Sequence, residues 1–329
     1  MLQSLDPQLA SFFAMLEAQG AHAFDIGTLN DPNINEMRNW YLNFGPHVAG
    51  QFIELQDVED LWIQVDDGNL RLRLYKTQRQ HSESCETLIY FHGGGWCIGS
   101  IETHDLLCRH LVNDLDVNVI SVDYRLAPEY PYPQAAHDAI HATQWIFEHA
   151  SALGIHPDHL YVAGDSAGGN LAAITALTFK EQTYRTSLAG QILIYPCIDL
   201  TVIHDNKYPS FEEQKLTPPL SAEQMSKMIQ IYLKNEDFAY QWLASPLLAQ
   251  SHQHLPSTLI ITAEFDPLRD QGRVYFEKLK SSLVNTEYHE IKGVVHGFFE
   301  MYGVLNKTKE TINIIRAWLK TIHKPNNQF

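Results

Sequence analysis

The chain has 329 residues and a formal net charge of −16, because 39 acidic side chains outnumber 23 basic ones. Hydrophobic residues make up 45% of the sequence, which is enough to fill the core of a large sheet. The acidic excess, without a basic stripe, argues against nucleic acid and anionic membrane surfaces as partners. No run approaches the roughly 18 apolar residues that a membrane span needs.

The cysteines and the N-terminus indicate a compartment. The sequence contains no C-x-x-C pair, which argues against a zinc site and against a disulfide framework. The four cysteines are Cys85, Cys97, Cys108 and Cys197. The first residues lack a basic segment, and their apolar side chains recur at helical spacing, which is typical of an amphipathic helix rather than a signal peptide. We therefore predict a cytoplasmic protein.

The first part of the chain is predicted to be helical and then to form a hairpin. Residues 1 to about 50 have a helical pattern with breaks at Gly20, at 30–32 and at Gly45-Pro46. Alternating residues at 61–65 and 70–74 then flank an Asp-Gly pair, which suits the positive φ angles of a tight hairpin turn.

From residue 87 onward, strand-like and helical segments alternate. The strand-like segments are 87–91, 117–122, 160–163, 191–195, 258–262 and 287–291. The helical segments include 134–149, 168–180, 271–283 and 307–322. Nearly continuous apolar strands separated by helices predict a mostly parallel central sheet covered on both faces, an α/β fold with the hairpin at one edge.

Two glycine-rich motifs follow buried strands. His92-Gly93-Gly94-Gly95 ends the strand-like segment 87–91, and its backbone N–H groups are open to a ligand. Gly164-Asp165-Ser166-Ala167-Gly168 lies between a buried strand and a helix, the context of a nucleophile elbow. Fixed N–H donors from such a loop and from the residue after the serine form an oxyanion hole for acyl transfer.

With these motifs, the sequence resembles the hormone-sensitive-lipase-like esterases of the α/β-hydrolase superfamily, and most of all their bacterial acetyl esterases. The similarity covers about residues 61–318. It rests on the two glycine motifs and on Asp123-Tyr124-Arg125-Leu126-Ala127-Pro128-Glu129, Glu264-Phe265-Asp266-Pro267-Leu268 and His296-Gly297-Phe298. The resemblance implies an α/β-hydrolase fold with a helical cap, and it implies that His92, Asp123, Arg125 and Glu129 support the glycine loop.

A serine nucleophile needs a base and an orienting acid. His296 follows the last strand-like segment, where α/β-hydrolases deliver their histidine, and is predicted as the base. Asp266 ends a strand and matches the D-P-L element of the family; Glu264 and Asp270 are the alternatives. The predicted catalytic residues are thus Ser166, Asp266 and His296.

The predicted oxyanion donors are the N–H groups of Gly94, Gly95 and Ala167, with Gly93 as a further candidate. Other polar residues have a structural interpretation. Asp165 is expected to anchor the loop. His137 and His141 have the i, i+4 spacing of metal ligands, but an exposed helix face is the better explanation of the pair.

The stretch after Tyr195 is too long for a simple crossover and contains a helix capped by Ser221. We predict a catalytic domain over 51–329 with a cap insertion at about 198–242, and a second cap contribution from residues 1–50. A cap of this kind would roof the pocket and restrict the size of the substrate. Trp96 and Tyr195 are candidates to narrow the pocket.

The predicted function is hydrolysis of short-chain carboxylic esters, acetyl to hexanoyl, through an acyl-enzyme on Ser166. No cofactor and no metal are implied, and the partner is a small-molecule ester. An amidase, peptidase or lactonase on the same fold remains an alternative, as does a non-catalytic small-molecule receptor. The sequence leaves the oligomeric state, a homodimer included, open.

Overall fold

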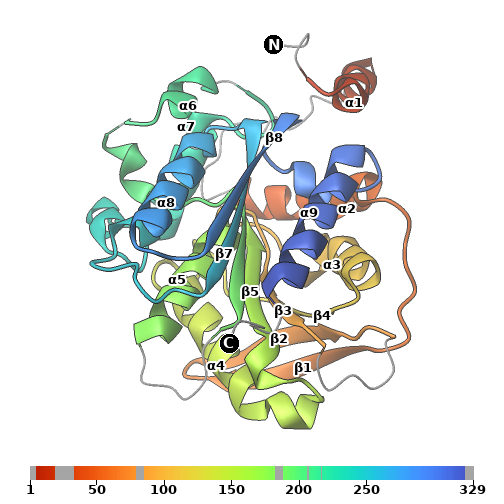
Figure 1. Ribbon diagram of the computed structural model, residues 1–329. Helices are drawn as coiled ribbons and strands as arrows, with labels where there is room; N and C mark the ends of the chain where they lie inside the picture. Colours follow the sequence, from red (N-terminus) through yellow and green to blue (C-terminus); the bar gives the residue numbers. More distant parts are fainter. Residues whose placement is uncertain are drawn as a thin grey trace.

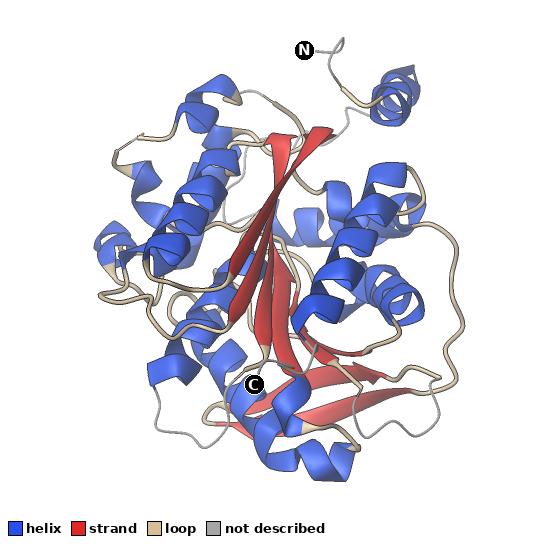
Figure 2. Ribbon diagram, viewed as in Figure 1, coloured by secondary structure: helices blue, strands red, loops and turns tan. Residues whose placement is uncertain are grey.

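The computed structural model describes residues 5–18, 33–78, 85–181, 188–205, 207–215 and 217–322. An eight-stranded sheet forms its centre, with helices on both faces (Figures 1 and 2). The strand order is β1-β2-β4-β3-β5-β6-β7-β8. The strands are β1 (Val58–Val65), β2 (Gly68–Tyr75), β3 (Thr87–Phe91), β4 (Asn118–Val122), β5 (Leu160–Asp165), β6 (Gly190–Ile194), β7 (Ser257–Phe265) and β8 (Thr286–Val295).

The pairing of the strands confirms the predicted sheet. β1 and β2 form the antiparallel hairpin at one edge, and β2 pairs antiparallel with β4. All remaining pairs are parallel. Strands β3 to β6 are buried at every position, as is expected for parallel strands covered on both faces. The carboxyl ends of these strands therefore meet at one edge, where ligands bind in such sheets.

Helices cover each face of the sheet with a separate core. They are α1 (Pro7–Ala18), α2 (Ile34–Ala49), α3 (Ile101–Leu115), α4 (Gln134–Leu153), α5 (Ala167–Glu181), α6 (Pro209–Glu213), α7 (Ala222–Leu233), α8 (Arg269–Ser281) and α9 (Asn306–Ile322). Along β3, Leu88 and Tyr90 pack in the core that contains α3 and α9, while Ile89 and Phe91 pack in the core that contains α4 and α5. Because successive side chains of a strand point to opposite faces of the sheet, β3 contributes side chains to both cores.

Two predictions about helices need correction. The predicted break at Gly45-Pro46 is wrong, because α2 continues to Ala49 with Pro46 inside it. Gly45 and Val48 are buried in that last turn, so packing offsets the hydrogen bond that a proline removes. The predicted breaks at Gly20 and 30–32 lie outside the described residues. Helix α3 was not among the predicted segments; Ser100 and Thr103 cap its start reciprocally.

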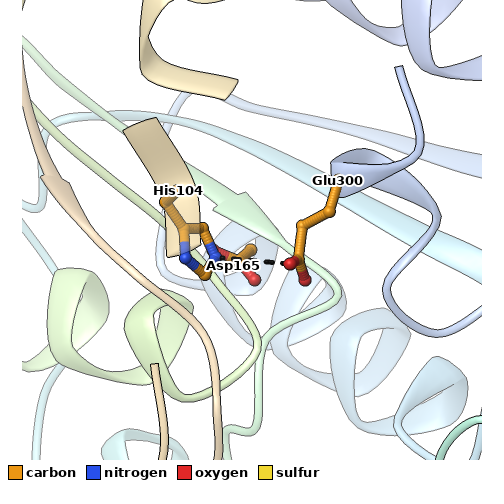
Figure 3. Close-up of side chains that lie close together, drawn as sticks. All are labelled: His104, Asp165 and Glu300. Carbon is orange, nitrogen blue, oxygen red and sulfur yellow. Dashed lines mark ion pairs between the residues drawn. The ribbon is translucent and has the colours of Figure 1, made fainter. Parts of the chain in front are cut away.

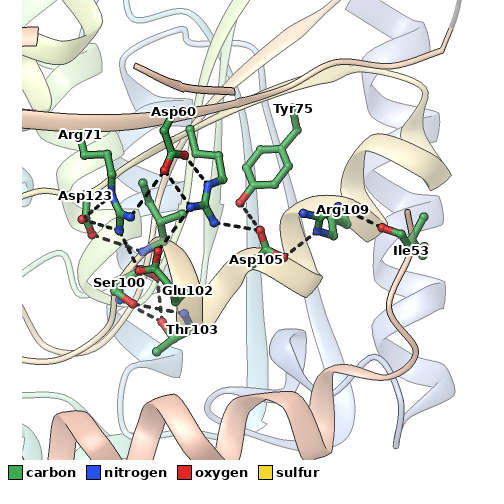
Figure 4. Close-up of polar contacts among 12 residues, drawn as sticks. Ile53, Asp60, Arg71, Tyr75, Ser100, Glu102, Thr103, Asp105, Arg109 and Asp123 are labelled. Atoms are coloured by element: carbon green, nitrogen blue, oxygen red, sulfur yellow. Dashed lines mark hydrogen bonds and ion pairs between the residues drawn. The ribbon is translucent and has the colours of Figure 1, made fainter. Parts of the chain in front are cut away.

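An arginine network joins the hairpin to α3 (Figure 4). Arg71 donates to Glu102 at 2.8 Å and to Asp123 at 2.9 Å, while Arg73 reaches Asp60 at 3.0 Å and Asp105 at 3.2 Å. The two arginines lie two residues apart on β2 and therefore project from the same face of that strand.

In the part of the chain that the structure describes, no helix combines the length and apolar character that crossing a bilayer requires.

Candidate active site

Ser166 lies in the sharp turn between β5 and α5, with a positive φ of 54°. The glycines around it are required by space. A Cβ at Gly164 would lie 2.4 Å from the Gly168 carbonyl, and one at Gly168 would lie 1.9 Å from the Phe91 carbonyl oxygen. The turn therefore packs its backbone directly on the end of β3 and holds the serine at the carboxyl edge of the sheet.

Three of the predicted site residues meet in one hydrogen-bonded chain. His296 Nε2 lies 2.9 Å from Ser166 Oγ, and His296 Nδ1 lies 2.7 Å from Asp266 Oδ2. Asp266 is fully buried at the end of β7, and its other oxygen accepts from Leu268 N at 2.7 Å. With Nδ1–H donated to the carboxylate, Nε2 is left to accept the serine proton.

The alternative acids contact other groups. Glu264 accepts from Lys292 and from the backbone of Gly293, while Asp270 accepts from Arg269 and from the backbone of Ser210. Both carboxylates therefore serve local ion pairs and loops rather than the imidazole of the site.

The surroundings of His296 favour its charged form. Burial opposes protonation, but the Asp266 carboxylate, its hydrogen bond and the more distant Asp165 and Glu300 outweigh burial, so the pKa of His296 is raised above its usual value. The ring of Tyr195 packs beside the imidazole, with the ring centroids 4.6 Å apart. An imidazole held in this way can receive a proton and keep it during a reaction.

The glycine loop lies opposite the serine. Gly94, Gly95 and Ala167 all line the pocket that contains Ser166. Gly94 and Gly95 have positive φ values of 116° and 58°, which turn the backbone of the loop. Gly93 requires a correction: its N–H donates to Asp165 Oδ1 at 3.0 Å, so that group is not available to a substrate.

A pocket of about 110 Å³ leads to Ser166. Its walls come from the glycine loop, from α2, from α7 and from the loop after His296. Its apolar lining includes Trp40, Phe44, Val48, Trp96, Ile98, Pro219, Leu220, Met225, Met228, Leu268 and Met301. Trp96 lies in the wall as predicted, while Tyr195 is not among the lining residues and packs behind His296 instead.

Comparison with known proteins identifies the family. A family model described as the alpha/beta hydrolase fold matches residues 88–300. An arylesterase of Saccharolobus solfataricus is 35% identical over 82% of this chain and 84% of its own length. An ethyl acetate hydrolase of Pseudomonas putida is 33% identical over 95% and 97%. This chain belongs to the hormone-sensitive-lipase-like esterases of the α/β-hydrolase superfamily.

The solved structures agree with this assignment. A thermophilic carboxylesterase from a metagenomic library superposes with a TM-score of 0.83 at 37% identity, covering 89% of this chain and 98% of its own. This protein is accordingly a carboxylic ester hydrolase. The three proteins named here are an arylesterase, an ethyl acetate hydrolase and a carboxylesterase; none is named as an amidase, peptidase, lactonase or receptor.

Several residues support the glycine loop of the esterase. His92 Nδ1 donates to the Gly93 carbonyl at 2.8 Å and its ring stacks on Tyr124 at 4.2 Å. Burial lowers the pKa of His92 to about 3, so this imidazole stays neutral. Arg125 differs from the expectation, because its guanidinium pairs with Asp138 on α4 at 2.6 Å rather than with the loop.

Sequence reasoning missed three residues that border the loop and the pocket. Arg38 donates to Cys97 O and Ala127 O, each at 2.9 Å, and pairs with Glu129. The Tyr41 hydroxyl donates to Glu300 at 2.5 Å, and both residues line the pocket. Arg38 and Tyr41 lie on α2, far from the motifs in sequence, so only the three-residue spacing of Arg38, Tyr41 and Phe44 could have drawn attention to them.

One group near the site has the composition of a metal ligand set. Among the described residues, His104, Asp165 and Glu300 place one ligand atom each within 4.8 Å of one another. Two of these residues also border the pocket.

Proposed function

We propose that this esterase hydrolyses short-chain carboxylic esters through an acyl-enzyme formed on Ser166. The observation that carries the proposal is the continuous hydrogen-bonded chain from Ser166 through His296 to Asp266 at the base of the pocket. His296 takes the serine proton as the hydroxyl attacks the ester carbonyl, and then gives it to the departing alcohol. Water repeats the attack on the acyl-enzyme, with His296 again as the base.

The developing negative charge needs donors. The N–H groups of Gly94, Gly95 and Ala167 border the same pocket as Ser166 and are the proposed oxyanion hole. Ala167 also begins α5, so the positive end of the helix dipole adds to the stabilisation. Removing one such donor costs on the order of a hundredfold or more in rate.

A two-part cap is proposed to set the preference for short acyl chains. Helix α2 from the first part, residues 1–50, contributes Trp40, Phe44 and Val48 to the pocket wall. Helix α7 from the insertion at about 198–242 contributes Met225 and Met228. The small cavity between these side chains and Ser166 favours acetyl to hexanoyl groups over longer ones. The cytoplasmic location of the enzyme stays a prediction.

The test is a set of initial rates on p-nitrophenyl acetate, butyrate, octanoate and laurate, for the wild type and for Ser166→Ala. We expect turnover that is fastest on the short esters and that falls by at least a thousandfold in the variant. Activity that survives in Ser166→Ala would remove the assigned nucleophile. Fastest turnover of octanoate or laurate would refute the proposed role of the cap.

A further inference from the structure

A second group of ionisable side chains is buried next to the nucleophile turn. His104 of α3, Asp165 at the end of β5 and Glu300 of the short helix η7 (Phe298–Glu300) point toward one another (Figure 3). His104 Nε2 lies 3.4 Å from Asp165 Oδ1 and 3.8 Å from Glu300 Oε2. The exposed fractions of the three side chains are 0% for His104, 1% for Asp165 and 15% for Glu300. The proposed ester hydrolysis gives none of them a chemical role.

The hydrogen bonds of Thr103 identify the tautomer of His104. The Thr103 hydroxyl has a single proton, and it donates this proton to Ser100 O at 2.9 Å. The contact of 2.8 Å between Thr103 Oγ1 and His104 Nδ1 must therefore be one in which His104 Nδ1–H donates. Nε2 is the remaining nitrogen, and it faces the two carboxylates. A bare lone pair there would be repelled by both, whereas a proton on Nε2 turns both contacts into attractions.

The other contacts of the carboxylates agree with a charged His104. Asp165 Oδ1 accepts from Tyr90 Oη at 2.8 Å and from Gly93 N at 3.0 Å. Burial raises the pKa of Asp165, but the charge of His104 at 3.4 Å and the hydrogen bond from Tyr90 outweigh burial and lower that pKa overall. Burial likewise opposes protonation of His104, and Glu300 and Asp165 outweigh it, so the pKa of His104 is raised.

We propose that His104 is a buried imidazolium held between Asp165 and Glu300, and that the Glu300 carboxylate of this triplet is a positioning group that sets the pH range in which His296 acts as base. The inference rests on the proposed function, since it assigns the base of that reaction to His296. The triplet is a proton site rather than a metal site, because the Nε2 proton occupies the position at which a metal ion would have to bind.

The charges that face these groups come from several elements. His296 contacts Asp266 at the end of β7 and the Tyr195 ring, and it lines the same pocket as Asp165 at the end of β5 and Glu300 of η7. Glu300 itself faces His104, Asp165, His296 and the Tyr41 hydroxyl of α2. His104 also faces the neutral ring of His92, with the ring centroids 5.5 Å apart.

The sign of the effect follows from these charges. Burial raises the pKa of Glu300, while His104 and the Tyr41 hydrogen bond oppose that rise. Above that pKa, Glu300 is negative and favours the charged form of His296, which contributes to the raised pKa of the base. Removing the negative charge should lower the pKa of His296, so that the base stays unprotonated, and the enzyme active, at lower pH.

The first experiment measures the charge of His104 directly. Histidine labelled with 15N in the full-length enzyme gives separate shifts for protonated and bare ring nitrogens. We expect one of the rings with protons on both nitrogens at pH 7 to be His104, so that its signals are absent in His104→Gln. His296→Asn separately identifies the signals of the catalytic ring, and His104→Asn repeats the assignment of His104 if His104→Gln does not fold. A bare Nε2 on His104 at pH 7 would overturn the proposal.

The second experiment measures the consequence in Glu300→Gln, which keeps the side-chain shape and an acceptor for Tyr41. We expect the acid limb of kcat/KM on p-nitrophenyl butyrate to move to lower pH, with a roughly threefold rise in the ratio of kcat/KM at pH 5 to that at pH 8. The matched control is Glu310→Gln, which removes the same charge from an exposed ion pair with Lys307 on α9.

The two hypotheses fail in different ways. An acid limb in Glu300→Gln that coincides with those of the wild type and Glu310→Gln would overturn the role of the triplet while leaving the esterase mechanism intact. Activity that survives in Ser166→Ala would overturn the proposed function. In that case the 15N shifts of His104 and His296, followed against pH in the wild type and Glu300→Gln, still test the charge and the coupling.

Discussion

Gly168 is the residue at which the nucleophile turn has least room. A Cβ there would lie 1.9 Å from the Phe91 carbonyl oxygen and 2.6 Å from the His92 carbonyl oxygen. Both atoms belong to the backbone that leads into the glycine loop, so the clash cannot be relieved by rotating a side chain. We expect Gly168→Ala to lower the free energy of unfolding by about 3 kcal/mol or more and esterase activity at least tenfold. Urea unfolding and initial rates measure the two effects.

Gly154 provides the control for this substitution. It ends α4 with a positive φ of 70°, and none of the described residues has an atom within 4 Å of the position of its Cβ. Gly154→Ala should therefore cost only the backbone strain, about 1–2 kcal/mol, with unchanged activity. Equal losses in the two variants would show that the turn at Gly168 yields more easily than the contacts indicate.

Two helices that are far apart in sequence enclose the pocket, and α7 offers the simpler test. Met225 is buried and lines the pocket, so Met225→Ala should leave space at the end of the acyl site. We expect the ratio of kcat/KM for p-nitrophenyl octanoate to that for the butyrate to rise about tenfold, which corresponds to burying about two of the additional methylenes at about 0.8 kcal/mol each.

Lys227→Ala is the control on the same helix. Lys227 pairs with Glu223 on the surface of α7, and its removal changes the helix but not the pocket. An unchanged chain-length ratio in Met225→Ala would mean that the length limit lies elsewhere, for example at Trp40 or Phe44 of α2. A similar rise in both variants would point to a loosened helix rather than to a larger acyl site.

The bounds of a helix or strand can be predicted from the sequence where a single hydrophobic pattern or a single motif covers the whole element. Strand β3 was predicted with its observed bounds, Thr87–Phe91, because a run of five buried residues between polar segments has a clear pattern. Helix α3 has a weaker sequence pattern because Asp105, Arg109 and His110 interrupt its apolar stripe, and two of these side chains reach partners on other elements. Those partners are invisible before the chain folds.

The candidate site divides in the same way. Ser166, Asp266 and His296 could be named from strand ends and short motifs, and the structure brings their side chains together. Arg38 and Glu300 could not be found in this way, since neither belongs to a sequence motif and the fold alone brings each of them to its partner. The Gly93 N–H was misassigned because the motif shows which backbone donors exist but not that one of them is already hydrogen-bonded to Asp165.

At the scale of the whole molecule, the two hydrophobic cores are combined with a formal net charge of −16. The chain has an excess of carboxylates. At the hairpin, Arg71 forms ion pairs with Glu102 and Asp123, and Arg73 forms an ion pair with Asp60. This network joins β1 and β2, at the edge of the sheet, to α3 on one face of the sheet (Figure 4). Its contribution depends on ionised carboxylates and therefore on pH.

Acid should weaken the fold through this network. The hydrogen bond and charge of Arg73 lower the pKa of Asp60 against a small burial effect, and Arg71 lowers the pKa of Glu102 against burial. A carboxyl whose folded pKa is lowered contributes stability above its unfolded pKa of about 4 and loses it as pH falls through the folded value. We expect the free energy of unfolding, measured in urea at pH 7, 5, 4 and 3, to decline below about pH 5.

Arg73→Met should make that decline shallower, since Asp60 would lose the partner that lowers its pKa, while stability at pH 7 falls. The control Lys307→Met removes the same charge from an exposed pair with Glu310 within one helix and should keep the slope of the wild type. If the slopes of all three proteins between pH 5 and pH 3 coincide, the hairpin network does not carry the acid sensitivity. The carboxylates elsewhere with lowered pKa values, such as Asp270 between Arg269 and Arg273, would then be its source.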